Sequence, residues 1–88
     1  MLFQPGAIVA TPCALRQCSK HSVDPMQLIR RHAAGDWGKL APEDVAANVH
    51  AVQHDLRVFS SYPLGEGIVW VITEADRSST CLLLPSEY

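Results

Sequence analysis

Two short apolar runs near the C-terminal end constrain the fold most strongly. They are residues 68–73 (Ile-Val-Trp-Val-Ile-Thr) and 80–84 (Thr-Cys-Leu-Leu-Leu), and a polar turn at 74–79 separates them. Each run is rich in β-branched, aromatic or aliphatic residues and is bounded by turn-forming residues, which is typical of a strand rather than a helix. Neither run alternates apolar with polar residues, so both faces of each strand should be covered. We therefore expect both segments to be central strands of a sheet.

Three helices are predicted before these strands. Thr11 and Asp24 are good N-caps, and each is followed by proline, a residue favoured at the first helical position. Gly35 is a natural left-handed stop for the second helix. The third helix should open at Pro42, and its buried face should carry valines spaced four and three apart: Val45, Val49 and Val52.

Further strands are expected at residues 6–10 and 56–62, so the predicted order is β-α-α-α-β-β-β. The three C-terminal strands, 56–62, 67–74 and 79–84, should form an antiparallel meander with the helices packed on one face. At 88 residues the chain should be a single small domain, 1–88, of the α+β class. The predicted core combines the valines of the third helix with Ile68, Trp70, Ile72, Leu82 and Leu84.

Composition and charge exclude several classes of protein. Hydrophobic residues make up 48% of the chain and charged residues 18%, which argues against disorder. The net charge of -2 has the wrong sign for a protein that binds nucleic acid through phosphate contacts. The first residues lack the pattern of an export signal, and no apolar run is long enough to span a bilayer. Three cysteines cannot all pair within one chain, so we expect free thiols in a cytoplasmic protein.

The turn between the two C-terminal runs holds the densest set of polar side chains. Glu74, Asp76 and Arg77 could together bind a metal ion, orient a water molecule or grip a phosphate. The commoner role for such a set is structural, with an ion pair and an aspartate-initiated turn closing a hairpin. Sequence leaves both interpretations open.

The loop after the second helix is the other candidate site. Trp37 lies between two glycines and could be an exposed anchor for a partner, while Asp36 and His32 could act as a base and its orienting group. The alternative is a turn in which Trp37 folds into a small core and His32 is satisfied at the helix end.

No metal or cofactor site is predicted. Cys13, Cys18 and His21, with or without His32, do not have a standard zinc spacing, and a fourth ligand is missing. The pair His50 and His54, one helical turn apart, lacks the acid that metal-binding helices usually carry between such histidines. The chain also has no nucleophile elbow and no phosphate-binding glycine fingerprint.

Several motifs resemble one family along nearly the whole chain. They are Thr11-Pro12 with Ala14-Leu15, Arg31-His32, Gly35-Asp36-Trp37-Gly38, Ser61-Tyr62, residues 70–78 (Trp-Val-Ile-Thr-Glu-Ala-Asp-Arg-Ser), Leu83-Leu84-Pro85 and Glu87-Tyr88. The chain resembles small bacterial proteins common on plasmids, prophages and other mobile elements, often labelled "plasmid-related protein" or "type I restriction endonuclease subunit M". The second label does not fit so short a chain, because a DNA methyltransferase needs a nucleotide-binding domain. The chain departs from the family pattern at Cys13, where glycine is usual, and at Lys39, where an acid is usual.

The resemblance implies that the protein is encoded on a mobile element. It implies no particular chemistry, because no activity is established for the family. We expect a non-enzymatic cytoplasmic interaction protein of a mobile element, which binds a host-defence protein (restriction or CRISPR-type) or a plasmid-maintenance protein. The predicted partner surface joins the two polar loops at one end of the molecule: Asp36, Trp37, Glu74, Asp76 and Arg77. The alternative is a small hydrolase or nuclease-like enzyme that uses Glu74, Asp76 and His32. A rival for the turn alone is that Arg77 pairs with Asp36 or Glu74 and only joins the loops.

Overall fold

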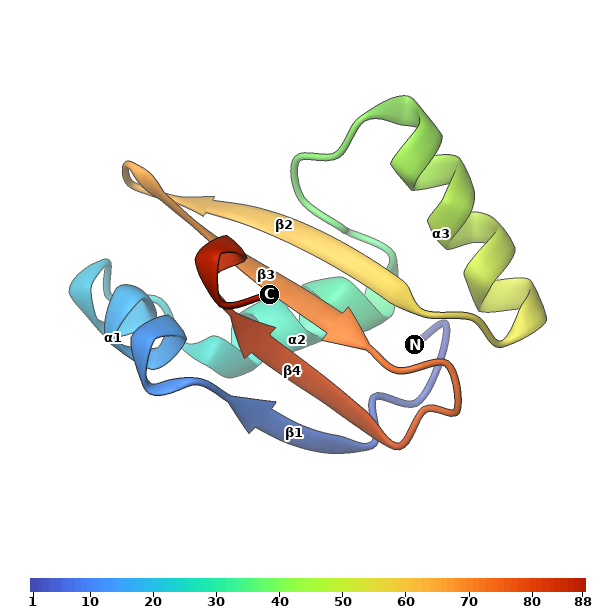
Figure 1. Cartoon of the computed structure of the whole chain (residues 1–88), viewed down its shortest axis with the longest axis horizontal. Helices are drawn as coiled ribbons and strands as arrows, with labels where there is room; N and C mark the ends of the chain where they lie inside the picture. The colour runs from blue at the N-terminus through green and yellow to red at the C-terminus, as the bar shows by residue number, and fades with distance from the viewer.

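The computed structural model describes all 88 residues, and the elements follow one another in the predicted order. Figure 1 shows them as one α+β domain, with the helix Pro25–Ala34 behind the sheet and the C-terminal turn in front of it. The elements are β1 (Ala7–Ala10), α1 (Pro12–Lys20), α2 (Pro25–Ala34), α3 (Pro42–His54), β2 (Val58–Leu64), β3 (Gly67–Thr73), β4 (Ser79–Leu83) and a short 3-10 helix, η1 (Pro85–Glu87).

The sheet has the strand order β1-β4-β3-β2. Strands β2, β3 and β4 form the predicted antiparallel meander, and β1 joins it in parallel beside β4. The sheet is therefore mixed, and β3 and β4 are its central strands, as their composition predicts.

Local signals place the first two helices correctly. The Thr11 side chain accepts a hydrogen bond from the backbone N–H of Ala14 at 3.1 Å, and Asp24 accepts one from Met26 N–H at 3.0 Å. Both are N-cap bonds that satisfy otherwise unpaired helical donors. Gly35 ends α2 with φ +94°, the left-handed conformation that glycine adopts without a steric cost.

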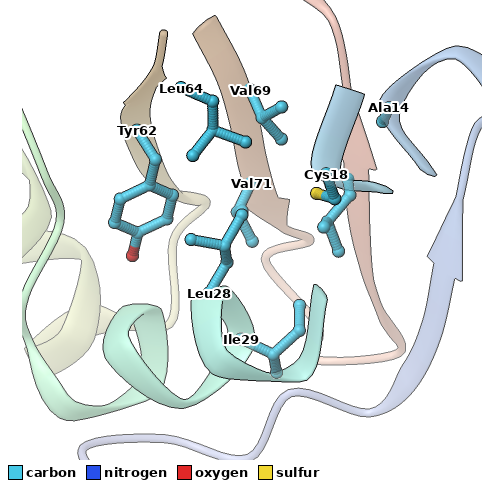
Figure 2. Packing of buried hydrophobic residues seen from close by; sticks show 9 residues of the cluster. Ala14, Cys18, Leu28, Ile29, Tyr62, Leu64, Val69 and Val71 are labelled. Carbon is cyan, nitrogen blue, oxygen red and sulfur yellow. The ribbon is translucent and has the colours of Figure 1, made fainter. Parts of the chain in front are cut away.

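The main core lies between the sheet and helices α1 and α2. Figure 2 shows Tyr62, Leu64, Val69 and Val71 of the sheet facing Leu28 of α2, with Ala14 and Cys18 of α1 beside them. Leu82 of β4 belongs to the same buried cluster, as predicted, and the partly buried Leu84 packs against it. Burial of these side chains, at about 25 cal/mol per Å² of apolar area, drives the packing of α1 and α2 on this face.

The prediction of which face of β3 enters this core is wrong. Val69, Val71 and Thr73 face the helices and are fully buried. On the opposite face Ile68 is exposed and Trp70 is half-buried, whereas Ile72 is buried there, at 6% exposure, outside the main core. Because residues 68–73 do not alternate, either face could have been the inner one. The expectation that both faces are covered holds only in part: η1 and the C-terminal residue lie over the second face, where Ile72 and Leu83 are buried and Trp70 is half-buried.

The position of α3 differs from the prediction too. Val45 and Val49 remain 40% and 47% exposed, and only Val52 packs against buried residues. The helix lies beside the edge strand β2 rather than over the sheet, and it turns Asn48 and Ala51 inward. Asn48 explains this placement, because its side-chain amide donates to Phe59 O at 2.6 Å and accepts from Phe59 N–H at 3.1 Å. None of the helices combines the length and the apolar character needed to cross a bilayer.

Candidate functional site

Trp37 lies in a second, smaller core and is not the exposed anchor that the sequence allowed. Its side chain is only 8% exposed and packs with Phe3, Ala51 and Val58. Its indole Nε1–H donates to His32 O at 3.1 Å, which satisfies its one polar group. The alternative interpretation of this loop is therefore the correct one for Trp37, and Trp37 offers no apolar contact at the surface.

Asp36 holds its own loop in place. Its carboxylate pairs with the Arg31 guanidinium at 2.7 Å and accepts from Gly38 N–H at 3.3 Å. The hydrogen bond from Arg31 holds the pKa of Asp36 below its usual value. Tyr62 donates to the backbone O of Asp36 at 2.7 Å, and Arg31 lies over the Tyr62 ring at 4.5 Å. These contacts tie the loop to β2.

In the polar turn, the two acids and Arg77 act on different neighbours. The Glu74 carboxylate pairs with Arg57 at 3.3 Å, and the Asp76 carboxylate accepts from Ser78 N–H at 3.0 Å. The hydrogen bonds from Ser78 lower the pKa of Asp76. Since each group already has a local partner, the turn does not present three converging side chains.

Arg77 binds backbone carbonyls rather than a carboxylate. Its guanidinium donates to the oxygens of Leu56, Ala51, Glu74 and Ala75 at 2.6, 3.0, 3.1 and 3.3 Å. This contradicts the predicted ion pair with Asp36 or Glu74, although the role is still that of joining segments. Ala51 and Leu56 lie at the end of α3 and in the connection to β2, so Arg77 ties the β3–β4 turn to that connection.

His32 lies at the centre of a buried polar network. Its Nδ1 is 2.5 Å from Ser60 Oγ and its Nε2 is 2.8 Å from Thr73 Oγ1. Thr73 Oγ1 is 2.6 Å from Thr80 Oγ1, and Thr80 donates to Pro5 O at 2.6 Å. A carbonyl oxygen can only accept, so the Thr80 hydroxyl must donate to Pro5 O. Thr80 then accepts from the Thr73 hydroxyl, and Thr73 in turn accepts from His32 Nε2–H. Burial lowers the pKa of His32 far enough to keep the ring uncharged at neutral pH, so its Nδ1 accepts from Ser60.

Both ring nitrogens of His32 bond to hydroxyl groups of this network, so neither bonds to a carboxylate. Its imidazole ring is fully buried, and burial, together with the charge of Arg77, lowers its pKa to about 4. No hydrogen bond or ion pair joins His32 to Asp36, Glu74 or Asp76. The geometry therefore does not assemble the groups that the enzyme alternative requires.

The same burial predicts a pH-dependent stability. An unfolded chain binds a proton at His32 below its ordinary pKa of 6.5, whereas the folded chain does so only near pH 4. The stability contributed by neutral His32 is therefore fully present above pH 6.5 and is lost as pH falls from 6.5 towards 4. We expect a loss on the order of 3 kcal/mol over this window. Urea unfolding at several pH values measures it, and a slope unchanged by His32→Gln would contradict the assignment.

The cysteines and the other histidines do not gather into a metal site. Cys18 is buried in the main core, where burial raises the pKa of its thiol, and Cys13 Sγ accepts from Arg16 at 3.0 Å. The rings of His50 and His54 stack on α3 with centroids 4.2 Å apart. No three His, Cys, Asp or Glu side chains are placed to share a metal ion, and the surface has no detectable pocket.

The face of the sheet turned away from α1 and α2 carries the surface that the sequence interpretation missed. We call it the open face. Its pairing register aligns Phe59, Ile72, Cys81 and Val9 in one row, and Trp70 with Leu83 in the next. The aromatic rings of Phe59, Trp70 and Tyr88 form a chain of edge contacts, with centroids 5.0 Å apart for Phe59–Trp70 and 5.9 Å apart for Trp70–Tyr88.

Charged side chains border this aromatic group. Arg57 donates to the Tyr88 hydroxyl at 2.7 Å and to Glu74 at 3.3 Å, so Glu74 is the one predicted site residue that lies next to the open face. The sequence does hold a signal for this surface: a strand that is apolar at every position has an apolar outer face even when only one face is covered by helices. Comparison of the chain with models of protein families, with curated proteins and with solved structures finds no match.

Proposed function

We propose that this chain is a non-catalytic interaction module whose open face binds a protein partner. The observation that carries the proposal is the aromatic group Phe59–Trp70–Tyr88, which lies on a sheet face that helices α1 and α2 leave uncovered. Apolar side chains that form a contiguous group on a protein surface mark interaction sites, whereas apolar side chains scattered singly do not.

The chemistry of the open face suits protein recognition. Tryptophan, tyrosine and arginine are the residues most enriched among those that dominate binding energy. Trp70 is held by edge contacts on two sides, and Arg57 fixes the Tyr88 hydroxyl at 2.7 Å. Because these side chains are already ordered, binding would cost little conformational entropy. The Arg57–Glu74 pair would supply the polar rim that such interfaces have.

The family resemblance supports a more specific partner. It points to mobile elements, so the partner we propose is a cytoplasmic host-defence protein of the restriction or CRISPR type, or a plasmid-maintenance protein. A nucleic acid is a weaker candidate, because the net charge of -2 provides no general attraction to phosphates.

Substitution of Trp70 tests the proposal. A tagged protein would first be used to isolate a stoichiometric partner from a bacterial lysate, and the purified pair would then be titrated. Trp70→Thr keeps strand propensity and removes the central ring, so we expect it to raise Kd by at least about 30-fold, the effect of losing about 2 kcal/mol at a hot spot. Val49→Thr, at an exposed position on α3, is the matched control and should leave Kd unchanged.

Two further variants distinguish the open face from the polar loops. Asp36→Ala and Asp76→Ala alter the loop surface that the sequence predicts and should bind the partner normally. If either abolishes binding while Trp70→Thr binds with unchanged Kd, the loops are the interaction surface and the proposal is wrong. Circular dichroism and thermal unfolding of each variant establish that the protein titrated is folded.

A further inference from the structure

The fold covers one edge of the sheet, at β2, and leaves the other edge, at β1, uncovered. At the β2 edge, Asn48 bonds both backbone groups of Phe59, and Ser61 exchanges hydrogen bonds with Trp37 O at 3.0 Å and Lys39 N–H at 2.8 Å. Gly38, with φ +74°, permits this approach, because a Cβ there would collide with Ser61 O. The β2 edge is therefore closed to another strand.

The β1 edge has no such cover. Figure 1 shows β1 as the outermost strand, with no other segment running along its outer side. Its four residues are Ala-Ile-Val-Ala, and Ile8 and Val9 are 38% and 48% exposed. Folded proteins usually protect an edge with charges, proline or a bulge within the strand, because free backbone groups attract other strands. Here the prolines lie only outside the strand, at positions 5 and 12.

The backbone bonds to β4 show which groups of β1 are free. Ala7 N–H donates to Ser78 O and Thr11 N–H donates to Leu82 O, both at 3.0 Å. In a parallel ladder the bonding residues alternate, so Ala7, Val9 and Thr11 point their backbone groups towards β4. The N–H and C=O groups of Ile8 and Ala10 therefore point outward.

We propose that β1 pairs antiparallel with β1 of a second copy of this chain, about a two-fold axis at Val9, to give a continuous eight-stranded sheet. In this register Ile8 of one copy exchanges both backbone bonds with Ala10 of the other, and the reverse pair does the same, so all four outward residues are satisfied. Each large Ile8 side chain faces a small Ala10 on the helix side of the sheet. The two Val9 side chains meet on the open face and join the two apolar rows.

The chemistry of the edge favours a second copy over a foreign strand. Residues 5–12 contain no charged side chain, so the two-fold axis brings no like charges of this segment together. The outward groups are complementary to themselves without further adjustment. A pair of four-residue strands buries less than the standard interface of about 1,600 Å², so the dimer should be weak, with Kd on the order of 10–100 µM.

Disulfide trapping tests the register. Cys13 and Cys81 are first replaced by serine, because Cys81 is the register neighbour of Val9 and would compete. In that background Val9→Cys should form a covalent dimer under mild oxidation, since Cα atoms of such a non-hydrogen-bonded pair lie about 4.5 Å apart. Ile8→Cys should not, because its copies are diagonal neighbours about 7–8 Å or more apart. Val49→Cys, equally exposed on α3, is the control for random collision.

Sedimentation of the unmodified chain gives an independent readout that needs no partner protein. Mass should rise towards the dimer between about 5 and about 500 µM, and Ile8→Lys should raise Kd at least about tenfold, because edge lysines oppose strand pairing. A monomer throughout this range overturns the proposal. Equal cross-linking by the Val9, Ile8 and Val49 cysteines overturns it too, and Val9 cysteines that couple only to a different protein would show that a foreign strand occupies the edge.

Discussion

Replacing His32 with alanine is expected to lower the free energy of unfolding by about 3–5 kcal/mol. The substitution leaves a cavity in place of a fully buried ring, and it removes the acceptor of Ser60 and the donor to Thr73. An unpaired buried hydroxyl costs about 1–3 kcal/mol beyond the lost packing. Because folded domains are stable by only about 5–15 kcal/mol, such a loss would remove a large share of the total free energy of unfolding.

Partner substitutions separate the hydrogen bonds from the cavity. Ser60→Ala removes one hydroxyl and almost no volume, so it should lower the free energy of unfolding less than His32→Ala does. The difference should equal the contribution of the cavity that His32→Ala leaves. Thr73→Val keeps the shape and breaks the chain of bonds to Thr80. Chemical denaturation of the three single variants and of the Ser60/His32 double variant gives the coupling energy. A His32→Ala effect below about 1 kcal/mol would mean that the network contributes nothing to stability.

The helices were predictable because their signals are local. A cap such as Thr11 or Asp24 acts on backbone groups two or three residues away, and the left-handed Gly35 depends only on its own φ angle. The rotation of α3 is not local. It depends on Asn48 reaching the backbone of Phe59, eleven residues further along the chain, and valine spacing alone points to the wrong face of the helix.

The choice of sheet face was not predictable for a related reason. Residues 68–72 are apolar at every position, so the inner face is decided by which side chains fit against α1 and α2, a property of the assembled fold. Trp37 shows the same limit, since a tryptophan between glycines is compatible with an exposed anchor and with a buried core. Its environment depends on Phe3, Ala51 and Val58, which come from three other parts of the chain.

The polar residues that stood out in the sequence mostly have structural partners. Asp36 and Asp76 accept hydrogen bonds from backbone N–H groups of their own loops, and Arg77 bonds four carbonyls. A polar side chain in a loop is therefore a sign of either binding or local folding, and sequence alone does not separate these roles. The structure gives each of these groups a structural partner, and the titrations of Asp36→Ala and Asp76→Ala test whether they also bind.

Arg77→Ala is accordingly expected to destabilise the protein by about 2–4 kcal/mol, since hydrogen bonds from a charged donor are worth about 1.5–3 kcal/mol. The guanidinium satisfies the carbonyls of Ala51 and Leu56 near the C-terminal end of α3, where a positive charge also interacts favourably with the helix dipole. It lies 5.3 Å from the centre of the Phe3 ring as well, so its loss would expose part of the second core.

Two controls and a binding measurement decide the role of Arg77. Arg77→Lys keeps the charge but cannot reach four carbonyls, so it should recover only part of the stability. Arg77→Gly removes the side chain while relieving the cost of φ +61°, so it should destabilise the protein less than Arg77→Ala does.

A drop in melting temperature of more than about 10 °C is expected for Arg77→Ala in a domain of this size. Its folded fraction should still bind the partner, because Arg77 lies outside the open face. An unchanged melting temperature with complete loss of partner binding would instead make Arg77 a contact residue and return the interaction surface to the polar turn.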